Sequence, residues 1–420
     1  MTSPRNTRRR RVTVVTSGHL STCPRMLKSA DAFAAAGYDV RVVATCHEPW
    51  AVETDRDVGS RRAWPVEVID YRRGNSALTY WRSGVRYRAA RTAVTVQGAA
   101  RAPLGLIARA FGRVHPELVR AATSAPADLL YGGTTGALAA VAEAARRLSI
   151  PYGIELEDWH SGESTGPDAP LDNVLAARVE ASVLRDASFA TTSSEPIAAA
   201  YRDRYGVEPA VVHNTFPLPS EPPDFSRSDP STLRLYWFSQ TIGPGRGLEE
   251  AVVAAGLAGI TAELALRGRA QPGYLEALRA LAAAHAPRLS VVHHVPASPD
   301  VMIDVARGYD VGLALELMAV PNRQLCLTNK AFTYILAGVA VAMSDTPGQH
   351  ALGVDLGHGA ALVPPGDAGA LASALARWAA DPAGLDGAKR TVWSAAVRRW
   401  HWEHDAERGT LYRLAEQALS

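Results

Sequence analysis

Cysteine is scarce in this sequence: Cys23, Cys46 and Cys326 are the only three among 420 residues, and they lie far apart. No Cys-x-x-Cys pair occurs, so the sequence supports neither a zinc knuckle nor a disulfide framework. An odd number of separated thiols suits a reducing compartment, where small buried cysteines serve mainly in packing. We therefore expect a cytoplasmic protein without a metal site.

Charge of one sign and long apolar runs are scarce too. Lysine and arginine total 44 against 42 acidic residues, a net charge of +2, which indicates no electrostatic demand for nucleic acid. No apolar run reaches the ~20 residues that span a bilayer. The basic residues 8–11 are expected to be a solvated tail. The alternative is a peripheral contact with anionic lipid at the inner face of the membrane.

The pattern that is present alternates strands with helices. Residues 12–16 form a short β-branched run, typical of a buried parallel strand. A loop, a helix over 25–36 that Gly37 ends, and a strand at 39–44 follow, which together make a βαβ unit. The alternation continues to about residue 215, so we predict a doubly wound α/β domain.

A proline- and serine-rich stretch then interrupts this alternation, which restarts at residue 233. We predict two doubly wound, Rossmann-like α/β domains facing a cleft, with a C-terminal helix that returns to the first domain. The predicted parts are a basic tail at 1–11, an N-terminal domain at 12–215, a linker at 216–232, a second domain at 233–389, and C-terminal helices at 390–420.

Ligands of open α/β sheets bind beyond the carboxyl ends of the strands, so the loops after strands are the candidate sites. The loop Ser17-Gly18-His19 lacks the Gly-x-Gly-x-x-Gly fingerprint of dinucleotide sites. Gly18 would let a ligand approach the backbone, and the helix N-terminus behind it favours an anion. A tight turn with no ligand is the equal alternative.

The loop after the strand at 233–238 contains Gln240, Thr241, two glycines around Pro244, and Arg246 at a helix start. A diphosphate leaving group needs dispersed positive charge and amide donors of this kind. We interpret this loop as a diphosphate site, in preference to a glycine-proline loop with a solvated arginine.

A third candidate segment begins at Glu316 and includes a predicted helix with Asn329 as N-cap and Lys330 in its first turn. Lysine there opposes the helix dipole and costs up to ~1 kcal/mol unless an anion is bound. Such a misplaced charge points to a functional site. Thr333 lies one turn from Lys330 and is expected to face the ligand.

Three acids, Glu155, Glu157 and Asp158, end a strand of the first domain. Burying all three together is costly, so we expect at least one to face the site. We favour Asp158 for this role and leave Glu155 and Glu157 open, with helix capping and solvent exposure as the alternative. The backbone of His294 and Val295, after another strand, is a candidate nucleobase contact. The arginine-rich segment 71–116 is either a solvated face of two helices, an anionic-acceptor site or a membrane-contacting surface.

Several of these segments follow the pattern of one family. Its first strand, loop and helix are similar to Val14-Val15-Thr16-Ser17-Gly18-His19 followed by Pro24-Arg25-Met26-Leu27. Its Lys-Gly diphosphate element is similar to Arg246-Gly247. Asn329-Lys330, Phe332, Tyr334 and Ala337-Gly338 are similar to its nucleotide-contacting helix. The chain thus resembles the retaining GT-B glycosyltransferases of the GT4-type group (glycosyl transferases group 1).

The resemblance implies metal-independent transfer of a hexosyl unit from a nucleoside-diphosphate sugar, most often a UDP-sugar, with no further cofactor. The acceptor, an envelope glycan or a specialised-metabolite aglycone, would lie mainly on the first domain and the donor on the second. The implied catalytic residues are His19, Asp158 and Glu316. The implied donor-binding residues are Gly18, Gln240, Thr241, Arg246, His294, Val295, Asn329, Lys330 and Thr333.

Two positions depart from the family pattern. Thr241 replaces an arginine, and Thr333 replaces a carboxylate that grips the nucleotide ribose, for which Glu316 is a candidate substitute. These departures leave two alternatives open. One is a sugar-nucleotide epimerase on the same fold, and the other is a non-catalytic partner of a transferase.

Overall fold

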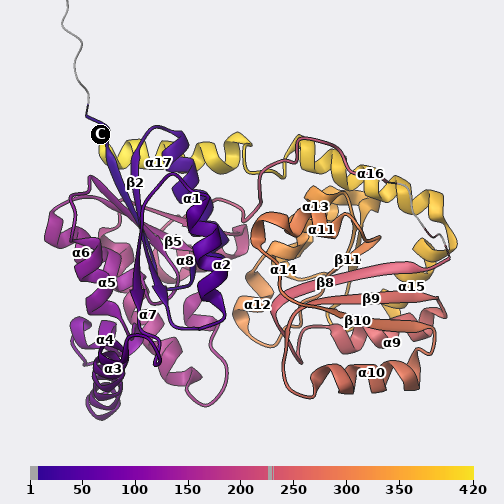
Figure 1. Ribbon diagram of the computed structural model, residues 1–420, viewed down its shortest axis with the longest axis horizontal. Helices are drawn as coiled ribbons and strands as arrows, with labels where there is room; N and C mark the ends of the chain where they lie inside the picture. Colours follow the sequence, from indigo (N-terminus) through magenta and orange to yellow (C-terminus); the bar gives the residue numbers. More distant parts are fainter. Residues whose placement is uncertain (1–7, 226–228, 230) are drawn as a thin grey trace, which may run out of the picture. The chain divides into compact units, whose positions relative to one another are not determined.

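The computed structural model describes residues 8–225, 229 and 231–420. They form two compact units (Figure 1). The first unit comprises the chain up to Val212 together with Arg408–Ser420, and the second comprises His213–Glu407. Each unit is a parallel sheet flanked by helices, as the alternating pattern of the sequence predicts.

The sheet of the first unit has seven parallel strands in the order β3-β2-β1-β4-β5-β6-β7. Because β1 pairs with both β2 and β4, the connections diverge there and leave the topological switch point at its carboxyl end. The strands are β1 Arg11–Thr16, β2 Asp39–Cys46, β3 Val66–Asp70, β4 Leu129–Gly133, β5 Tyr152–Leu156, β6 Phe189–Thr192 and β7 Ala210–Val211.

The helices of the first unit begin and end where local chemistry predicts. Pro24 opens the first of them, and Gly37, at φ 88°, follows its end. The helices are α1 Pro24–Ala35, α2 Ala51–Ser60, α3 Ala77–Gln97, α4 Leu104–Phe111, α5 His115–Ala122, α6 Leu138–Leu148, α7 Ala169–Asp186, α8 Glu195–Tyr205 and α17 Thr410–Leu419. Within the described part of the chain, no helix is both long and apolar enough to cross a bilayer.

The sheet of the second unit has six parallel strands in the order β10-β9-β8-β11-β12-β13. Two of its inner strands, β11 and β12, are buried throughout, which explains their near-continuous apolar sequences. The strands are β8 Leu233–Ile242, β9 Ala262–Ala270, β10 Leu289–His294, β11 Val311–Ala314, β12 Ala340–Ser344 and β13 Ala360–Val363.

Apolar clusters on both faces of this second sheet anchor its helices. They are α9 Leu248–Ala258, α10 Tyr274–His285, α11 Met302–Ala306, α12 Pro321–Leu325, α13 Asn329–Ala337, α14 Pro347–Leu356, α15 Ala368–Ala380 and α16 Pro382–Arg398.

The expected boundary at residue 390 is wrong. It falls inside α16, whose buried face packs on the second unit because Val392 and Ala395 belong to that unit's core. The chain returns to the first unit only at Arg408, and α17 is held there by the Tyr412 hydroxyl, which donates to Ala32 O at 2.8 Å.

Two other predicted segments need adjustment. Of the predicted basic tail, residues 1–7 lie outside the described residues, whereas Arg11 is already the first residue of β1. Of the predicted linker, residues 226–228 and 230 lie outside the described residues. The described remainder lacks helix and strand and belongs to the second unit.

A buried carboxylate joins the two ends of the second unit. Glu407 is fully buried in a π-helical turn over Asp405–Gly409, and it accepts hydrogen bonds from the backbone N–H of His213 at 2.5 Å and from Arg399 at 2.5 Å. His213 Nδ1 lies 2.9 Å from the same carboxylate. Burial by itself raises the pKa of Glu407, but the His213 hydrogen bonds and the Arg399 charge outweigh it, so the pKa lies below its ordinary value.

We predict that Glu407→Ala lowers the free energy of unfolding by about 3 kcal/mol, because it leaves the half-buried Arg399 and the backbone N–H of His213 without their partner. In the wild type, the contribution of Glu407 is fully present above its unfolded pKa of about 4.3 and is lost as the pH falls through its lower folded pKa. Urea denaturation across pH tests both. The exposed Glu276→Gln serves as control, and equal stability of the two variants would contradict the prediction.

Candidate functional site

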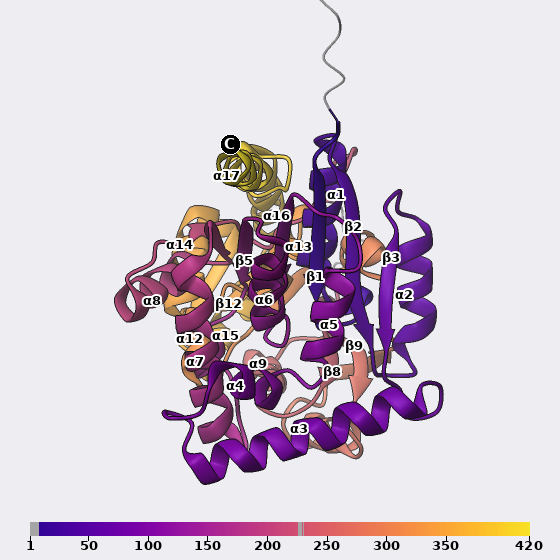
Figure 2. The same ribbon diagram turned by 90° about the vertical axis from the view of Figure 1, so that its left-hand side faces the viewer.

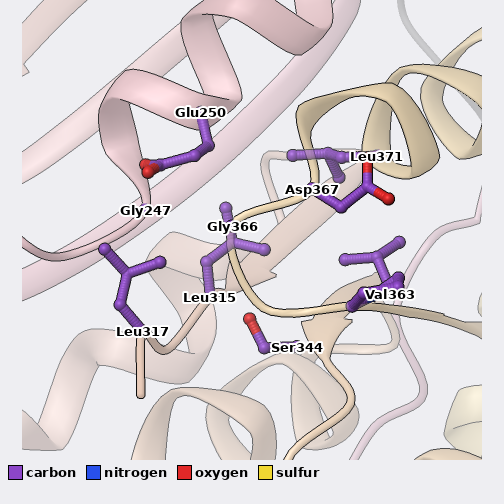
Figure 3. A pocket seen from close by; sticks show the side chains of 10 residues that line it. Gly247, Glu250, Leu315, Leu317, Ser344, Val363, Gly366, Asp367 and Leu371 are labelled. Atoms are coloured by element: carbon purple, nitrogen blue, oxygen red, sulfur yellow. The ribbon is translucent and has the colours of Figure 1, made fainter. Parts of the chain in front are cut away.

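A small hollow lies beyond the carboxyl ends of the second sheet, where ligands of open α/β sheets bind (Figure 3). Its empty volume is about 220 Å³, open solvent included. Side chains and backbone from α9 and from the ends of β11, β12 and β13 line it. They are Gly247, Glu250, Leu315, Leu317, Ser344, Val363, Pro364, Gly366, Asp367 and Leu371.

The start of α9 forms one wall of the hollow. Gly247 is its N-cap at φ 75°, and a Cβ there would lie 2.6 Å from the Leu315 Cβ, so only glycine fits. No side chain caps this helix start, which leaves the first backbone N–H groups and the positive end of the helix dipole available to an anion. Glu250 lies in the first turn, and its buried Oε2 has no hydrogen-bond partner within the described residues.

A buried carboxylate borders this hollow. Glu316 follows β11 and is 2% exposed, and its backbone N–H donates to Ser344 Oγ at 3.0 Å. Arg323 donates to Glu316 Oε2 at 3.2 Å, and Lys330 Nζ lies 3.6 Å from Glu316 Oε1. One acid therefore gathers two cations from two different helices.

Arg246 adds a third positive charge to this group. Burial lowers the pKa of Arg246, and the charge of Arg323 lowers it further, while Glu316 partly compensates. Burial also lowers the pKa of Lys330, with repulsion from Arg246 and Arg323 opposing the attraction of Glu316. Three cations facing one carboxylate leave two positive charges in excess among these four groups, an arrangement that attracts a polyanion.

The structure thus brings together three of the predicted residues, Glu316, Arg246 and Lys330. Arg323 was missed by sequence reasoning. Its only sequence signal is a second basic residue placed before the predicted helix, seven positions after Glu316. We call Arg246, Glu316, Arg323 and Lys330 the cation cluster.

The first turn of α13 differs from the prediction. Thr328, not Asn329, is the N-cap residue, and Asn329 is the first helical residue. The Lys330 ammonium donates to Thr328 Oγ1 at 3.4 Å and lies 5.3 Å from the centroid of the Trp237 ring. Thr333 is buried, and its hydroxyl donates back to Asn329 O at 3.3 Å, a local bond that occupies its only donor.

The remaining predicted residues of the second unit lie on the β8–β10 side of the same edge. Gln240 and Thr241 are exposed near the end of β8, where its pairing with β9 is irregular between Phe238 and Thr241. His294 ends β10, and burial together with the Arg267 charge lowers its pKa. The Val295 side chain is 71% exposed, and its carbonyl accepts from Arg267 at 2.8 Å.

In the first unit, Gly18 and His19 are held by packing. A Cβ at Gly18 would overlap the Cys23 sulfur. His19 is buried, with Nδ1 2.9 Å from Asp55 Oδ2 and Nε2 accepting the backbone N–H of Glu48 at 3.2 Å. Both ring nitrogens of His19 are therefore engaged inside the protein.

One metal-type ligand set occurs in residues 8–225 and 231–420: His19, Cys46 and Asp55, whose ligand atoms lie within 4.8 Å of one another. A metal ion there would have to displace the His19–Asp55 hydrogen bond. Burial also raises the pKa of the Cys46 thiol, which disfavours the thiolate that metals bind.

The three acids at the end of β5 take different roles. Glu155 is a core residue, with Arg25 Nε 2.6 Å from Oε1 and the Tyr131 hydroxyl donating to Oε2 at 2.6 Å. Burial raises the pKa of Glu157 to about 7, and the neighbouring charge of Asp158 adds to the effect. Glu157 and Asp158 both lie just beyond the carboxyl end of β5 and are half-buried.

Comparisons with known proteins agree with this architecture. Residues 24–215 match the model of the glycosyl transferase 4-like domain, whereas no curated protein matches the sequence significantly.

Several solved structures share the fold over nearly the whole chain. Anabaena HepE, solved with UDP and glucose, matches with a TM-score of 0.68 at 16% identity over 98% of this chain and 99% of that chain. TarM of S. aureus, solved as a variant in complex with UDP among other ligands, matches with a TM-score of 0.68 at 6% identity over 97% and 99%. MurG of Acinetobacter baumannii matches with a TM-score of 0.52 at 16% identity over 97% and 99%.

At these identities the likeness establishes the fold, and the family match is confined to the first unit. Residues 24–215 are therefore similar to the glycosyl transferase 4-like domain, and the chain as a whole has the GT-B fold of glycosyltransferases.

Proposed function

We propose that this protein transfers a hexosyl unit from a UDP-sugar to an acceptor, without a metal ion and with retention at the anomeric carbon. The observation that carries the proposal is the cation cluster, in which Arg246, Arg323 and Lys330 surround the single carboxylate of Glu316 beside an uncapped helix N-terminus. Anabaena HepE, which shares the fold, was solved with UDP and with UDP-glucose.

The chemistry needs such a cluster because departure of UDP develops negative charge on the diphosphate as the sugar–oxygen bond breaks. Arg246 and Lys330 are the proposed diphosphate contacts, joined by Arg323, and they stabilise that charge without reorganising. The backbone N–H groups of α9 lie beside the same hollow and supply further donors. Fixed cations of this kind take the role that a divalent metal ion has in other transferases, which supports metal-independent transfer.

The other predicted residues receive narrower roles. Gln240, Thr241, Asn329, Thr333 and the backbone of His294 and Val295 are proposed to contact the nucleotide, on the strength of their place at the same edge of the second sheet.

On the acceptor side, Asp158 is proposed to orient the acceptor hydroxyl, with Glu157 beside it. His19 is proposed to act as a positioning residue, because its two ring nitrogens are already hydrogen-bonded to Asp55 and to a backbone amide. Gly18 shapes the same loop, and the acceptor class of an envelope glycan or an aglycone follows from the family resemblance.

Peripheral membrane contact is the proposed placement of this cytoplasmic enzyme. Leu78, Trp81 and Val85 are 71%, 50% and 61% exposed and share one face of α3 at helical spacing. Co-sedimentation with vesicles containing phosphatidylserine should be measurable and should fall at least severalfold in Trp81→Ala. Equal sedimentation of this variant and the wild type would contradict the contact.

The donor site is tested by thermal-shift titration with UDP. Saturation at a hundred times the dissociation constant should stabilise the wild type by about 2.7 kcal/mol. Lys330→Ala and Arg246→Ala should each weaken UDP binding by about ten- to hundredfold, since a hydrogen bond to a charged group contributes roughly 1.5–3 kcal/mol. Arg279→Ala, on the outer helix α10, is the matched control and should bind UDP normally.

The carboxylate of the cluster gives a test of opposite sign. Glu316→Gln leaves three cations without their counter-charge, so the free variant should melt at a lower temperature than the wild type. Its UDP-induced shift should be larger, because UDP then neutralises more repulsion. A smaller shift, like that of Lys330→Ala, would argue against a role for Glu316 as the internal counter-ion.

Transfer itself is tested with UDP-sugars in the presence of EDTA. We expect transfer to persist with EDTA, and the anomeric configuration of the product, determined by proton NMR, to equal that of the donor. Loss of activity that divalent cations restore, or an inverted product, would contradict the proposal. Conversion of the UDP-sugar without acceptor into an epimer would instead favour the epimerase.

A further inference from the structure

The first unit contains a second, larger hollow between α2 and the edge strand β3, which lie side by side with few contacts between them (Figure 2). Its empty volume is about 960 Å³, open solvent included. The lining residues share an apolar character with a few charged groups: Leu20, Cys46, Val52, Asp55, Arg56, Gly59, Trp64, Pro65, Val66, Val68, Asp70 and Arg72. We call this hollow the α2–β3 groove.

The carboxylates that line the groove, Asp55 and Asp70, already accept hydrogen bonds from other residues of the protein. Asp55 accepts from the Ser21 backbone N–H at 2.8 Å and is bonded to His19 at 2.9 Å. Asp70 accepts from Arg72 and from Asn75, each at 2.5 Å. A sugar bound in the groove would need free donors and acceptors, whereas a hydrocarbon needs none. The lining therefore favours a hydrocarbon ligand.

The shape of the groove also fits a chain. Its lining follows α2 from Val52 to Gly59 and β3 from Val66 to Asp70, so the groove is elongated along these two elements. The stretch of β3 from Val66 to Asp70 is about 13 Å long at ~3.3 Å per residue, which matches an extended chain of roughly ten methylene groups.

One charged side chain of the lining, that of Arg56, is available to pair with a ligand. Arg56 is exposed on α2 and makes no hydrogen bond or ion pair with the described residues. Val68, a lining residue on β3, is 48% exposed. An apolar wall with a cation at its rim is complementary to an amphiphile whose chain is hydrocarbon and whose head is anionic.

We propose that the α2–β3 groove binds the hydrocarbon chain of an amphiphilic acceptor, with Arg56 pairing its anionic head group. The proposal rests on the proposed glycosyl transfer and names the acceptor class for it. Two lining residues, Cys46 and Asp70, end β2 and β3, and a third, Asp55, bonds to His19, so the groove reaches the carboxyl edge of the first sheet, where acceptors of this fold class are expected.

The test is calorimetric titration of the full chain with butyl, octyl, decyl and tetradecyl phosphate below their micellar concentrations. Each added methylene group should tighten binding by about three- to fourfold until the chain fills the groove near decyl, after which affinity should level off. Affinity that does not depend on chain length would overturn the proposal.

Two variants locate the binding. Val68→Asp places a charge on the apolar wall and should weaken decyl phosphate binding by at least tenfold, whereas Val354→Asp, at a 61% exposed valine of the second unit, should leave it unchanged. Arg56→Glu lies on an exposed helix face and should fold normally; it should weaken decyl phosphate but not 1-decanol. Wild-type affinity in both Val68→Asp and Arg56→Glu would place the amphiphile elsewhere.

The UDP-induced thermal shift, measured on the same samples, separates this proposal from the proposed function. Val68→Asp should keep the full UDP shift, because the cation cluster belongs to the second unit. Alkyl phosphate binding without any UDP shift in the wild type would count against the transferase while retaining the groove. A normal UDP shift without chain-length-dependent alkyl binding would remove the groove from acceptor recognition.

Discussion

The proposed function depends on one interaction, the crowding of three cations around the buried carboxylate of Glu316. These cations are Arg246, Arg323 and Lys330. Burying like charges together is unfavourable, and a single acid offsets only part of the repulsion. The fold supports this arrangement because Glu316 follows β11, Arg246 precedes α9, and Arg323 and Lys330 lie on α12 and α13. Of these elements, β11, α9 and α13 are anchored in the apolar core of the second unit. We propose that a bound polyanion compensates this excess positive charge, which would couple the stability of this edge to its ligand.

At the carboxyl edge of the first sheet, in contrast, charged side chains are paired with one another inside the protein. The Arg25–Glu155 pair, the hydrogen bond of the Tyr131 hydroxyl and the His19–Asp55 bond all satisfy charges internally. A site of this kind offers shape and apolar surface more than charge, and the α2–β3 groove is one example of it. The two units therefore share one fold class, whereas the ligands that we propose for them differ: a diphosphate on one and an amphiphile on the other. Because each sheet has its own switch point, one fold class supports both.

Several details of the site differ from the prediction, because side chains form hydrogen bonds and ion pairs that the sequence does not predict. Thr333 returns its hydroxyl to Asn329 O, and His19 engages both ring nitrogens with residues 29 to 36 positions away. Arg323 joined the cluster through a short helix that has no periodic signal of its own. The groove was likewise invisible, because α2 and β3 are short, partly exposed and rich in charge.

The sequence by itself determined the alternation of strands and helices, hence two parallel sheets, the helix ends marked by Pro24 and Gly37, and the placing of Arg246 and Lys330 at helix starts. These features are local, since they depend on hydrophobic periodicity, backbone φ and the geometry of βα turns. Only the tertiary structure decided that α16 stays with the second unit while α17 joins the first, that Arg323 and Glu316 meet, and that α2 and β3 leave a groove between them. Those outcomes depend on contacts between residues far apart in the chain, whose energies come from burial and charge compensation that no sequence window contains.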